Sequence, residues 1–234
     1  MSTVELTILT GKIERDHLKL FLKRIFDELF AKPSIRRSLV QPTMKKTSRM
    51  RKLNGIQLSS EQITLITKVV KEKPACRFLV FGVGNDSLYW ELMNEGGQTV
   101  FIEDKQFWID RVKRRSSNIS ISMVTYNSNL SDWQKFLDDP ALLEMSFPDG
   151  LADQEWDVIL VDAPAGYDDS CSGRMKSIYA ALQLVKKTGD IFVHDCDRKI
   201  EALYCDQLLK PENMQVELKA TDAGYLRHYR FDHN

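Results

Sequence analysis

Short apolar runs alternate with amphipathic segments along the chain from residue 57 onward. Apolar runs of about four to eight residues are typical of buried strands, whereas apolar residues spaced three and four apart are typical of helices. The predicted strands cover 77–81, 120–126, 157–162, 190–195, 215–219 and 225–231. One further predicted strand ends in the run TVFIED, whose last residue is 104. The predicted helices cover about 60–73, 86–95, 107–114, 131–143, 174–186 and 199–209. This alternation predicts an α/β fold with a mostly parallel seven-stranded sheet and helices on both faces.

The N-terminal part has a different pattern. Apolar residues recur at helical spacing from Ile13 to Phe30, so we expect an amphipathic helix whose stripe either covers the main domain or pairs with a second copy in a homo-oligomer. Between Lys32 and Lys52 there are eight Lys and Arg residues and no acidic residue, which is typical of a linker or a mobile basic arm. We therefore divide the chain into an N-terminal extension, 1–55, and a main domain, 56–234.

Composition and charge narrow the class of protein. With 234 residues, 43% of them hydrophobic, the chain can bury one sizeable core. The formal net charge is zero, but residues 1–55 hold 13 Lys and Arg against 5 Asp and Glu. No aromatic residue is interleaved in the basic arm to stack bases, and the remainder is acidic, so nucleic acid is not an expected partner. No apolar run approaches the roughly 20 residues of a membrane span, and no leader pattern opens the chain. We expect a cytoplasmic protein, although a chain trimmed of an anchor would give the same pattern.

The first predicted strand runs into the turn FLVFGVGNDS. Gly82 and Gly84 let the backbone turn sharply and approach a ligand without a Cβ, and Asp86 or Ser87 can cap the following helix. Glu103 ends the next strand 21 positions after Gly82, close to the offset of about 20 residues at which an acid binds ribose hydroxyls. Ser87 stands where a dinucleotide fingerprint would have a third Gly. The pattern favours a nucleoside cofactor without phosphates, with S-adenosylmethionine as the leading candidate.

Polar residues also follow the fourth and fifth predicted strands, whose ends lie at the ligand-binding edge of such a sheet. Asp162 ends the fourth strand, and the fifth is followed by His194, Asp195, Asp197 and Arg198. Asp162, His194 or Asp195 is a candidate general base, and the sequence does not rank them. Asp162 and Asp195 also form a tentative site for a divalent cation, which prefers carboxylate oxygens. The alternatives are that Asp197 caps the next helix and that His194 is a hydrogen-bonded core residue.

Six sequence blocks in this order carry a resemblance: FLVFGVGNDSLYW, VFIEDKQFW, EWDVILVDAPAGY, SGRMKSIYAA, FVHDCDRKIE and LRHYRF. Together they resemble the polysaccharide-biosynthesis methyltransferase family, typified by plant glucuronoxylan 4-O-methyltransferases and their irregular-xylem relatives. The resemblance covers about residues 57–231. It implies a Rossmann-like class I methyltransferase that moves a methyl group from S-adenosylmethionine to a saccharide hydroxyl, in the plant members O4 of a glucuronic acid.

Candidate site residues follow from the matching positions and their neighbours. Those expected to bind the cofactor are Phe81, Gly82, Gly84, Asn85, Ser87, Glu103, Asp104 and Asp162. Those expected on the acceptor side are Gly166, Tyr167, Arg174, Asp197 and Arg198, beside Asp162, His194 and Asp195.

Two positions depart from the family pattern. Asn85 stands where the family usually has His, and Ala165 stands where the glucuronoxylan enzymes usually have Arg. The second departure removes a cation from the acceptor side. Two other functions therefore stay open: a small-molecule O-methyltransferase that uses a divalent cation, and a non-catalytic member that binds a cofactor or glycan as a scaffold.

Overall fold

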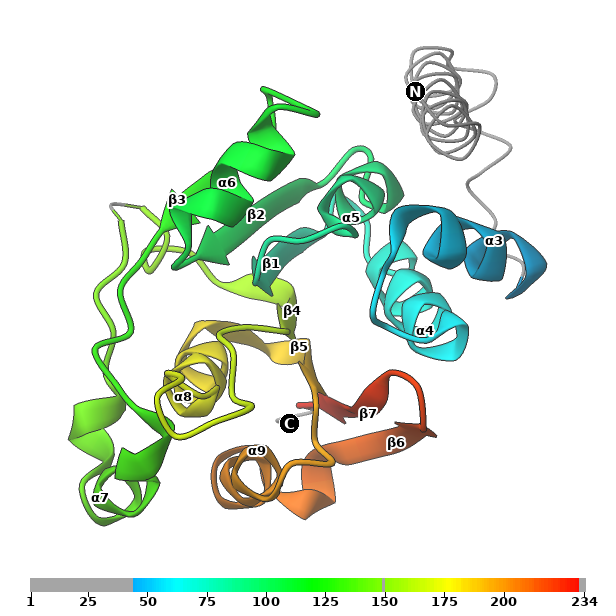
Figure 1. Cartoon of the computed structure of the whole chain (residues 1–234). Coiled ribbons are helices and arrows are strands. Elements are labelled where there is room, and N and C mark those ends of the chain that lie inside the picture. The colour runs from blue at the N-terminus through cyan, green and yellow to red at the C-terminus, as the bar shows by residue number, and fades with distance from the viewer. Residues whose placement is uncertain (1–43, 149, 232–234) are drawn as a thin grey trace, which may run out of the picture. The chain divides into compact units, whose positions relative to one another are not determined.

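The computed structural model describes residues 44–148 and 150–231, and its central feature is a seven-stranded sheet (Figure 1). The strands are β1 Arg77–Phe81, β2 Gln98–Glu103, β3 Ile121–Met123, β4 Trp156–Val161, β5 Val185–His194, β6 Met214–Ala220 and β7 Gly224–Arg230. They lie in the order β3-β2-β1-β4-β5-β7-β6. The first five pair in parallel, and β7 runs antiparallel between β5 and β6. The predicted seven-stranded, mostly parallel sheet is confirmed.

The strand order reverses at the centre of the sheet, between β1 and β4. The chain runs outward from β1 to β3 and then returns to β4, so the carboxyl ends of β1 and β4 are neighbours. The N–H of Asp162 donates to the carbonyl of Phe81 over 2.9 Å, which joins the two ends. Ligands of open α/β sheets bind at such a reversal. The fold therefore directs attention to the loops after β1 and β4.

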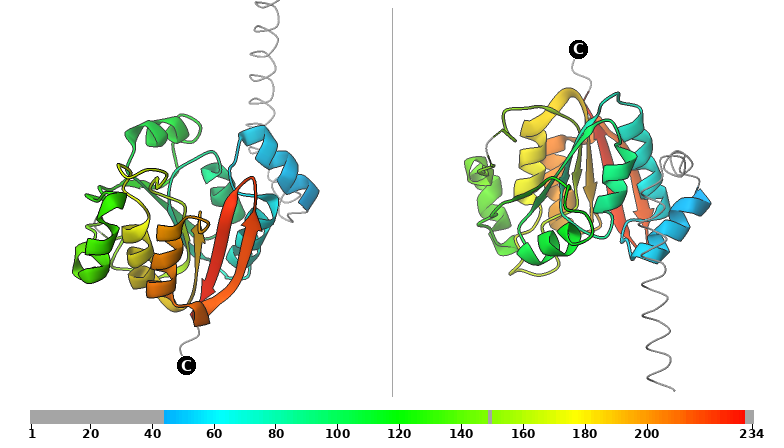
Figure 2. Two further views of the ribbon diagram at one scale, coloured as in Figure 1. Left: turned by 60° about the horizontal axis from the view of Figure 1, so that its bottom comes forward. Right: turned by 90° about the horizontal axis from the view of Figure 1, so that it is seen from above.

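Helices cover both faces of the sheet (Figure 2). The α-helices are α3 Met44–Asn54, α4 Ser60–Lys71, α5 Ser87–Met93, α6 Gln106–Lys113, α7 Trp133–Asp138, α8 Met175–Leu184 and α9 Lys199–Tyr204. Short helical turns of other types are η1 Leu130–Asp132, η2 Pro140–Leu143, η3 Cys205–Leu209 and η4 Pro211–Asn213. A capping box begins α4, since Ser59 Oγ accepts from the Gln62 N–H and Gln62 Oε1 accepts from the Ser59 N–H.

Successive residues of β1 enter the two halves of the core, because side chains alternate across a strand. Leu79 and Phe81 pack in the cluster that includes α8 residues. Phe78 and Val80 pack in the cluster that includes α4 residues and Trp90 of α5. The central strand is thus buried on both faces, which is why it reads as a continuous apolar run.

Three predicted segments differ from the structure. Residues 44–52, predicted as part of a linker, form most of α3, a stretch with no Gly or Pro that ends before Gly55 at φ +64°. The predicted helix 131–143 is divided because Pro140, which has no N–H, follows α7. The predicted strand 120–126 shrinks to β3, an edge strand that pairs with β2 alone. The other predicted elements have boundaries within about two residues, except that β5 begins at Val185, before the predicted start at 190 and within the predicted helix 174–186.

The predicted helix Ile13–Phe30 and the first part of the basic arm lie outside the described residues. Homo-oligomerisation through that helix therefore stays a prediction. Among the described helices, none is both long and apolar enough to cross a bilayer.

Candidate functional site

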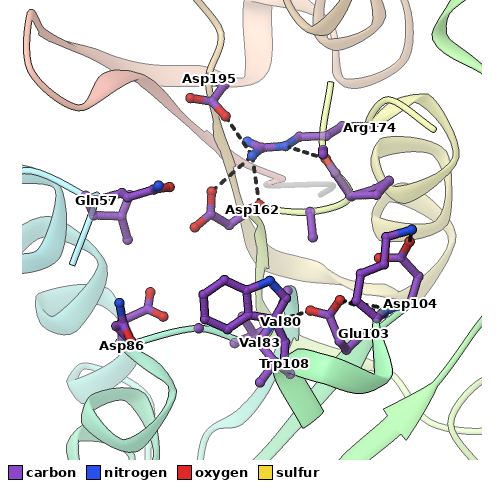
Figure 3. A pocket seen from close by; sticks show the side chains of 18 of the residues that line it. Gln57, Val80, Val83, Asp86, Glu103, Asp104, Trp108, Asp162, Arg174 and Asp195 are labelled. Atoms are coloured by element: carbon purple, nitrogen blue, oxygen red, sulfur yellow. Dashed lines mark hydrogen bonds and ion pairs between the residues drawn. The ribbon is translucent and has the colours of Figure 1, made fainter. Parts of the chain in front are cut away.

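A cavity of about 370 Å³ lies over the carboxyl ends of β1, β2 and β4 (Figure 3). Its walls include the connection between α3 and α4, residues 55–58. The predicted site residues that line it are Gly82, Gly84, Asn85, Glu103, Asp104, Asp162, Tyr167, Arg174, Asp195 and Arg198. Five others are not part of the lining that the described residues form: Phe81, Ser87, Gly166, His194 and Asp197.

The glycine turn brings backbone against the cavity. Gly82 has φ +118°, and a Cβ there would lie 3.0 Å from the Cβ of Ala163, so a side chain is both strained and crowded. The N–H of Gly84 donates to Ser87 Oγ over 2.9 Å. Asp86 occupies the N-cap position of α5, but its Oδ2 accepts from the Trp90 indole over 2.8 Å rather than from the helix backbone. The prediction that Asp86 or Ser87 caps α5 through its side chain is therefore wrong.

Glu103 closes one end of the cavity. It is 4% exposed, and its Oε2 accepts from the N–H of Val83 over 2.8 Å. Its Oε1 accepts from the N–H groups of Asp104 and Lys105 over 3.1 and 2.8 Å. Burial outweighs these donors and raises the pKa of Glu103 to about 7. The backbone fixes this carboxylate at the cavity edge, with lone pairs still available to a ligand.

Arg174 joins the ends of β4 and β5. Its Nη2 lies 3.2 Å from Asp162 Oδ1 and 2.7 Å from Asp195 Oδ2, and it also donates to the carbonyl of Asp162 over 2.7 Å. Its Nη1 donates to the carbonyl of His194, and its Nε to that of Pro164. The residue is 4% exposed. Its guanidinium is bound to the protein itself, which gives it a positioning role beside the cavity.

His194 is buried behind Asp162. Its Nδ1 lies 2.8 Å from Asp162 Oδ1, and its Nε2 donates to the carbonyl of Ala223. Burial lowers the pKa of His194, but the neighbouring Asp162 carboxylate outweighs burial and the net direction is upward. Burial conversely acts to raise the pKa of Asp162, and His194 with Arg174 lowers it overall. Both ring nitrogens are engaged, so the cavity-facing carboxylate of this pair is the group that a ligand can reach.

Arg198 borders the cavity beyond Asp195. Its Nη2 lies 2.9 Å from Asp195 Oδ2, and its Nη1, which is buried and makes no hydrogen bond among the described residues, lies 3.8 Å from Glu201 Oε1. The side chain of Arg198 is 30% exposed, unlike that of Arg174. Asp197 accepts from the N–H of Tyr225 over 3.0 Å, so its side chain supports the β7 start rather than capping α9. Tyr167 lies at the cavity with 77% of its surface exposed.

The tentative cation site can be tested on these contacts. Asp162, His194 and Asp195 each offer one ligand atom, and these atoms lie within 4.8 Å of one another. The positive charge between the two carboxylates is already that of Arg174. A divalent cation bound by the same two oxygens would have to displace this guanidinium, and the cation site stays a prediction.

Sequence patterns missed two cavity walls. The connection 55–58 belongs to no strand end, and its lining role depends on how α3 packs beside α4. Asp86, predicted only as a helix cap, and Trp108, not predicted as a site residue, both line the cavity. The one available signal was the position of Asp86 two residues beyond Gly84.

Comparison with known proteins decides the family. The family model IRX15/IRX15L/GXM matches residues 61–144 and 138–229. The chain belongs to this family. Glucuronoxylan 4-O-methyltransferase 2 of Arabidopsis thaliana is 33% identical over 199 residues, which cover 74% of this chain and 65% of that relative. Arabinogalactan O-methyltransferase 2 of the same plant is 34% identical over 198 residues, covering 74% and 66%. The resemblance carried by the six sequence blocks is confirmed, and the chain spans about two thirds of the length of these relatives.

A solved structure supports the fold of this IRX15/IRX15L/GXM member. The structure is from Staphylococcus aureus and is assigned as a caffeoyl-CoA O-methyltransferase. It matches with a TM-score of 0.52 at 14% identity, over 90% of this chain and 99% of that one. The predicted Rossmann-like methyltransferase fold is thereby confirmed.

Proposed function

We propose that the protein transfers a methyl group from S-adenosylmethionine to a hydroxyl group of a saccharide. The observation that carries this proposal is one cavity that joins the glycine turn and Glu103 to the Asp162 and Asp195 carboxylates at the strand-order reversal. Membership of a family that includes glucuronoxylan and arabinogalactan O-methyltransferases supports the saccharide acceptor.

The residues present fit the cofactor. The cavity volume falls in the usual range for small-molecule sites, about 300–1,000 Å³. Glu103 can accept hydrogen bonds from ribose hydroxyls, and the Trp108 ring offers an apolar surface to a base. The absence of a side chain at Gly82 keeps the turn open beside Ala163. When bound, the cofactor supplies an electrophilic methyl group on a sulfonium.

Asp162 is the base we propose for the acceptor hydroxyl. As the new C–O bond forms and the C–S bond breaks, the hydroxyl proton passes to the carboxylate. A protonated ether is a far stronger acid than a carboxylic acid, so the lowered pKa of Asp162 does not prevent this transfer. His194 and Arg174 hold the other side of the carboxylate in place. Most of the acceleration would come from positioning the two reactants.

Among saccharides, we propose a uronic acid acceptor, with methylation at O4 of glucuronic acid as its specific form. The supporting feature is Arg198, which lies at the cavity with 30% of its side chain exposed, whereas the side chain of Arg174 is only 5% exposed. With Ala165 where the plant enzymes usually have Arg, Arg198 is the side chain best arranged to pair with an acceptor carboxylate.

A methyl-transfer screen with labelled S-adenosylmethionine tests the proposal. Glucuronate-bearing oligosaccharides should be labelled, neutral sugars should be labelled less, and hydroxylated aromatic metabolites should not. S-Adenosylhomocysteine should raise the melting temperature, because a ligand of the native state stabilises it by mass action. Normal folding without binding of either cofactor form would contradict methyltransferase activity and favour the scaffold alternative.

Turnover in the presence of EDTA tests the alternative function, an O-methyltransferase that uses a divalent cation. Since Arg174 lies between Asp162 and Asp195, we expect turnover to survive EDTA. Loss of turnover that magnesium or manganese restores would show that a cation enters this group and that Arg174 moves aside.

A further inference from the structure

The cavity has a second polar end, on the side away from Glu103 and Asp104 (Figure 3). Gln57, from the connection between α3 and α4, and Asp86, from the loop after β1, reach this end from separate elements. Neither residue was among the predicted site residues. Their arrangement points to a specific part of the cofactor in the function proposed above, on which this inference rests.

Gln57 is turned toward the cavity by its neighbours. Ile56 and Leu58 are 6% and 1% exposed and pack in the core, whereas Gln57 between them is exposed and lines the cavity. The carbonyl of Gln57 accepts from Arg51 Nη2 over 3.3 Å, and the carbonyl of Gly55 accepts from Asn85 Nδ2 over 3.2 Å. The backbone is thus held at two points. The carboxamide of Gln57 has no hydrogen-bond partner among the described residues and extends into the cavity.

Asp86 is a carboxylate without a paired cation in the part of the chain that the structure describes. Its carboxylate accepts a hydrogen bond from the Trp90 indole, a neutral donor, over 2.8 Å. Asp162, across the cavity, differs because Arg174 and His194 compensate its charge. An uncompensated carboxylate at a cavity wall is electrostatically suited to a cationic group of a ligand.

We propose that Asp86 and Gln57 bind the amino acid end of S-adenosylmethionine. Asp86 accepts hydrogen bonds from the α-ammonium, and the Gln57 carboxamide N–H donates to the α-carboxylate. The cofactor carries ribose hydroxyls on one side of its sulfur and this zwitterion on the other. With Glu103 at the ribose end, the zwitterion falls at the opposite end of the cavity, where these two residues lie. The charge of Asp86 repels the carboxylate, which leaves that group to Gln57.

Calorimetry with two ligands measures how much the amino acid end of the cofactor contributes to binding. S-Adenosylhomocysteine carries the zwitterion, whereas 5′-methylthioadenosine keeps the adenosine and sulfur but lacks it. Asp86→Asn retains an acceptor for Trp90 and should weaken S-adenosylhomocysteine binding about 10- to 100-fold, the range of a lost charge-assisted contact. Gln57→Ala should weaken it about 5- to 10-fold. Neither change should alter the affinity for methylthioadenosine by more than about twofold.

A third ligand assigns the two contacts separately. Decarboxylated S-adenosylhomocysteine keeps the ammonium and lacks the carboxylate. Gln57→Ala should leave its affinity unchanged, whereas Asp86→Asn should still weaken it. Matched controls outside the cavity lining are Glu61→Gln, on an exposed face of α4, and Gln134→Ala, exposed on α7. Both should bind all three ligands as the unaltered protein does.

The outcomes separate two failures. If the unaltered protein binds neither S-adenosylhomocysteine nor methylthioadenosine, the proposed function fails. If it binds both and Asp86→Asn weakens both equally, Asp86 supports the glycine turn and the assignment of the amino acid end is wrong. If the variants bind all three ligands normally but lose turnover, the two residues contact the acceptor instead.

Discussion

The guanidinium of Arg174 lies 2.7 Å from the carboxylate of Asp195, and the two residues connect α8 to the end of β5 beneath the cavity. Asp195 itself has φ +61°, a left-handed conformation that is costly for a residue with a side chain. The ion pair therefore helps to hold a strained residue at the site.

Replacing Arg174 should disturb the whole site rather than the reading of one substrate. Arg174→Ala leaves Asp162 and Asp195 without their shared partner, so we expect methyl transfer to acidic and neutral sugars to fall equally, by about 100-fold or more. The loss of a buried ion-pair partner should also cost about 3–5 kcal/mol of unfolding free energy. Initial rates on both acceptors and urea denaturation test this. Loss confined to the acidic acceptor would assign Arg174 to the carboxylate.

Replacing Arg198 should reduce methyl transfer to acidic sugars more than to neutral sugars. Arg198→Ala removes a guanidinium that contacts Asp195 on one side and borders the cavity on the other. Efficiency on a uronic acid acceptor should fall about 10- to 100-fold, and on the matched neutral sugar only a few-fold. The comparison of kcat/KM on the two sugars is the measurement. Equal losses would remove Arg198 from substrate recognition.

Replacing Gly82 tests whether the backbone of the glycine turn lies against the bound cofactor, and a second glycine provides a matched control. Gly82→Ala places a Cβ 3.0 Å from Ala163 at φ +118°, so we expect a loss of about 1–3 kcal/mol in stability and weaker binding of S-adenosylhomocysteine. Gly96→Ala is the control, because Gly96 also has positive φ but a Cβ there meets no atom within 4 Å. The Gly96→Ala protein should be less stable, but its affinity for S-adenosylhomocysteine should stay unchanged. Equal affinity in both variants would show that the turn does not approach the ligand.

Asp86 should lower the stability of the ligand-free protein at neutral pH. Burial, together with the charge of Asp162, raises the pKa of Asp86 to about 6 from a usual 3.8. The folded protein then binds the proton more tightly than the unfolded chain, so stability falls as pH rises from about 4 to 6. Asp86→Asn should raise the unfolding free energy by about 1–3 kcal/mol at pH 7, with little gain at pH 4. Urea titrations at both pH values measure this. A pH-independent effect would contradict an ionisable cause.

Asp190, which lies within β5, should give stability the opposite pH dependence. Burial favours its protonation, but contacts of 2.7–2.8 Å from His228, Lys73 and Arg230 outweigh burial and lower its pKa to about 2. Its stabilisation is therefore complete above about pH 4 and is lost as pH falls through 2. Asp190→Asn should cost about 2–4 kcal/mol at pH 7 and flatten the acid limb of the stability curve.

A surface pair provides the control for Asp190. Asp206 pairs with Arg227 but is 48% exposed, so Asp206→Asn should cost under about 1 kcal/mol. Thermal melts between pH 2 and 7 compare the two variants. Similar costs in both would show that the network around Asp190 adds no more than a surface pair.

Local patterns predicted the sheet, the glycine turn and Glu103 because these features depend on alternation, on a missing Cβ and on a spacing set by one strand–helix–strand unit. They did not predict that Arg174 would be bound by internal acceptors, and they left open whether His194 is a base or the hydrogen-bonded core residue that the structure shows. Those properties depend on distant residues such as Ala223, which approaches only once β7 has returned beside β5. Gln57 could not be predicted for the same reason.

The wall at residues 55–58 lies outside the stretch that the family model matches, which begins at residue 61. A version that begins at residue 61 would retain every strand of the sheet yet open one side of the cavity to solvent. Arg51, which pairs with Asp222 in the turn before β7 over 2.9 Å, would be lost with it. The smallest unit suitable for binding studies should therefore begin no later than α3, because this short segment forms the cavity wall without contributing to the sheet.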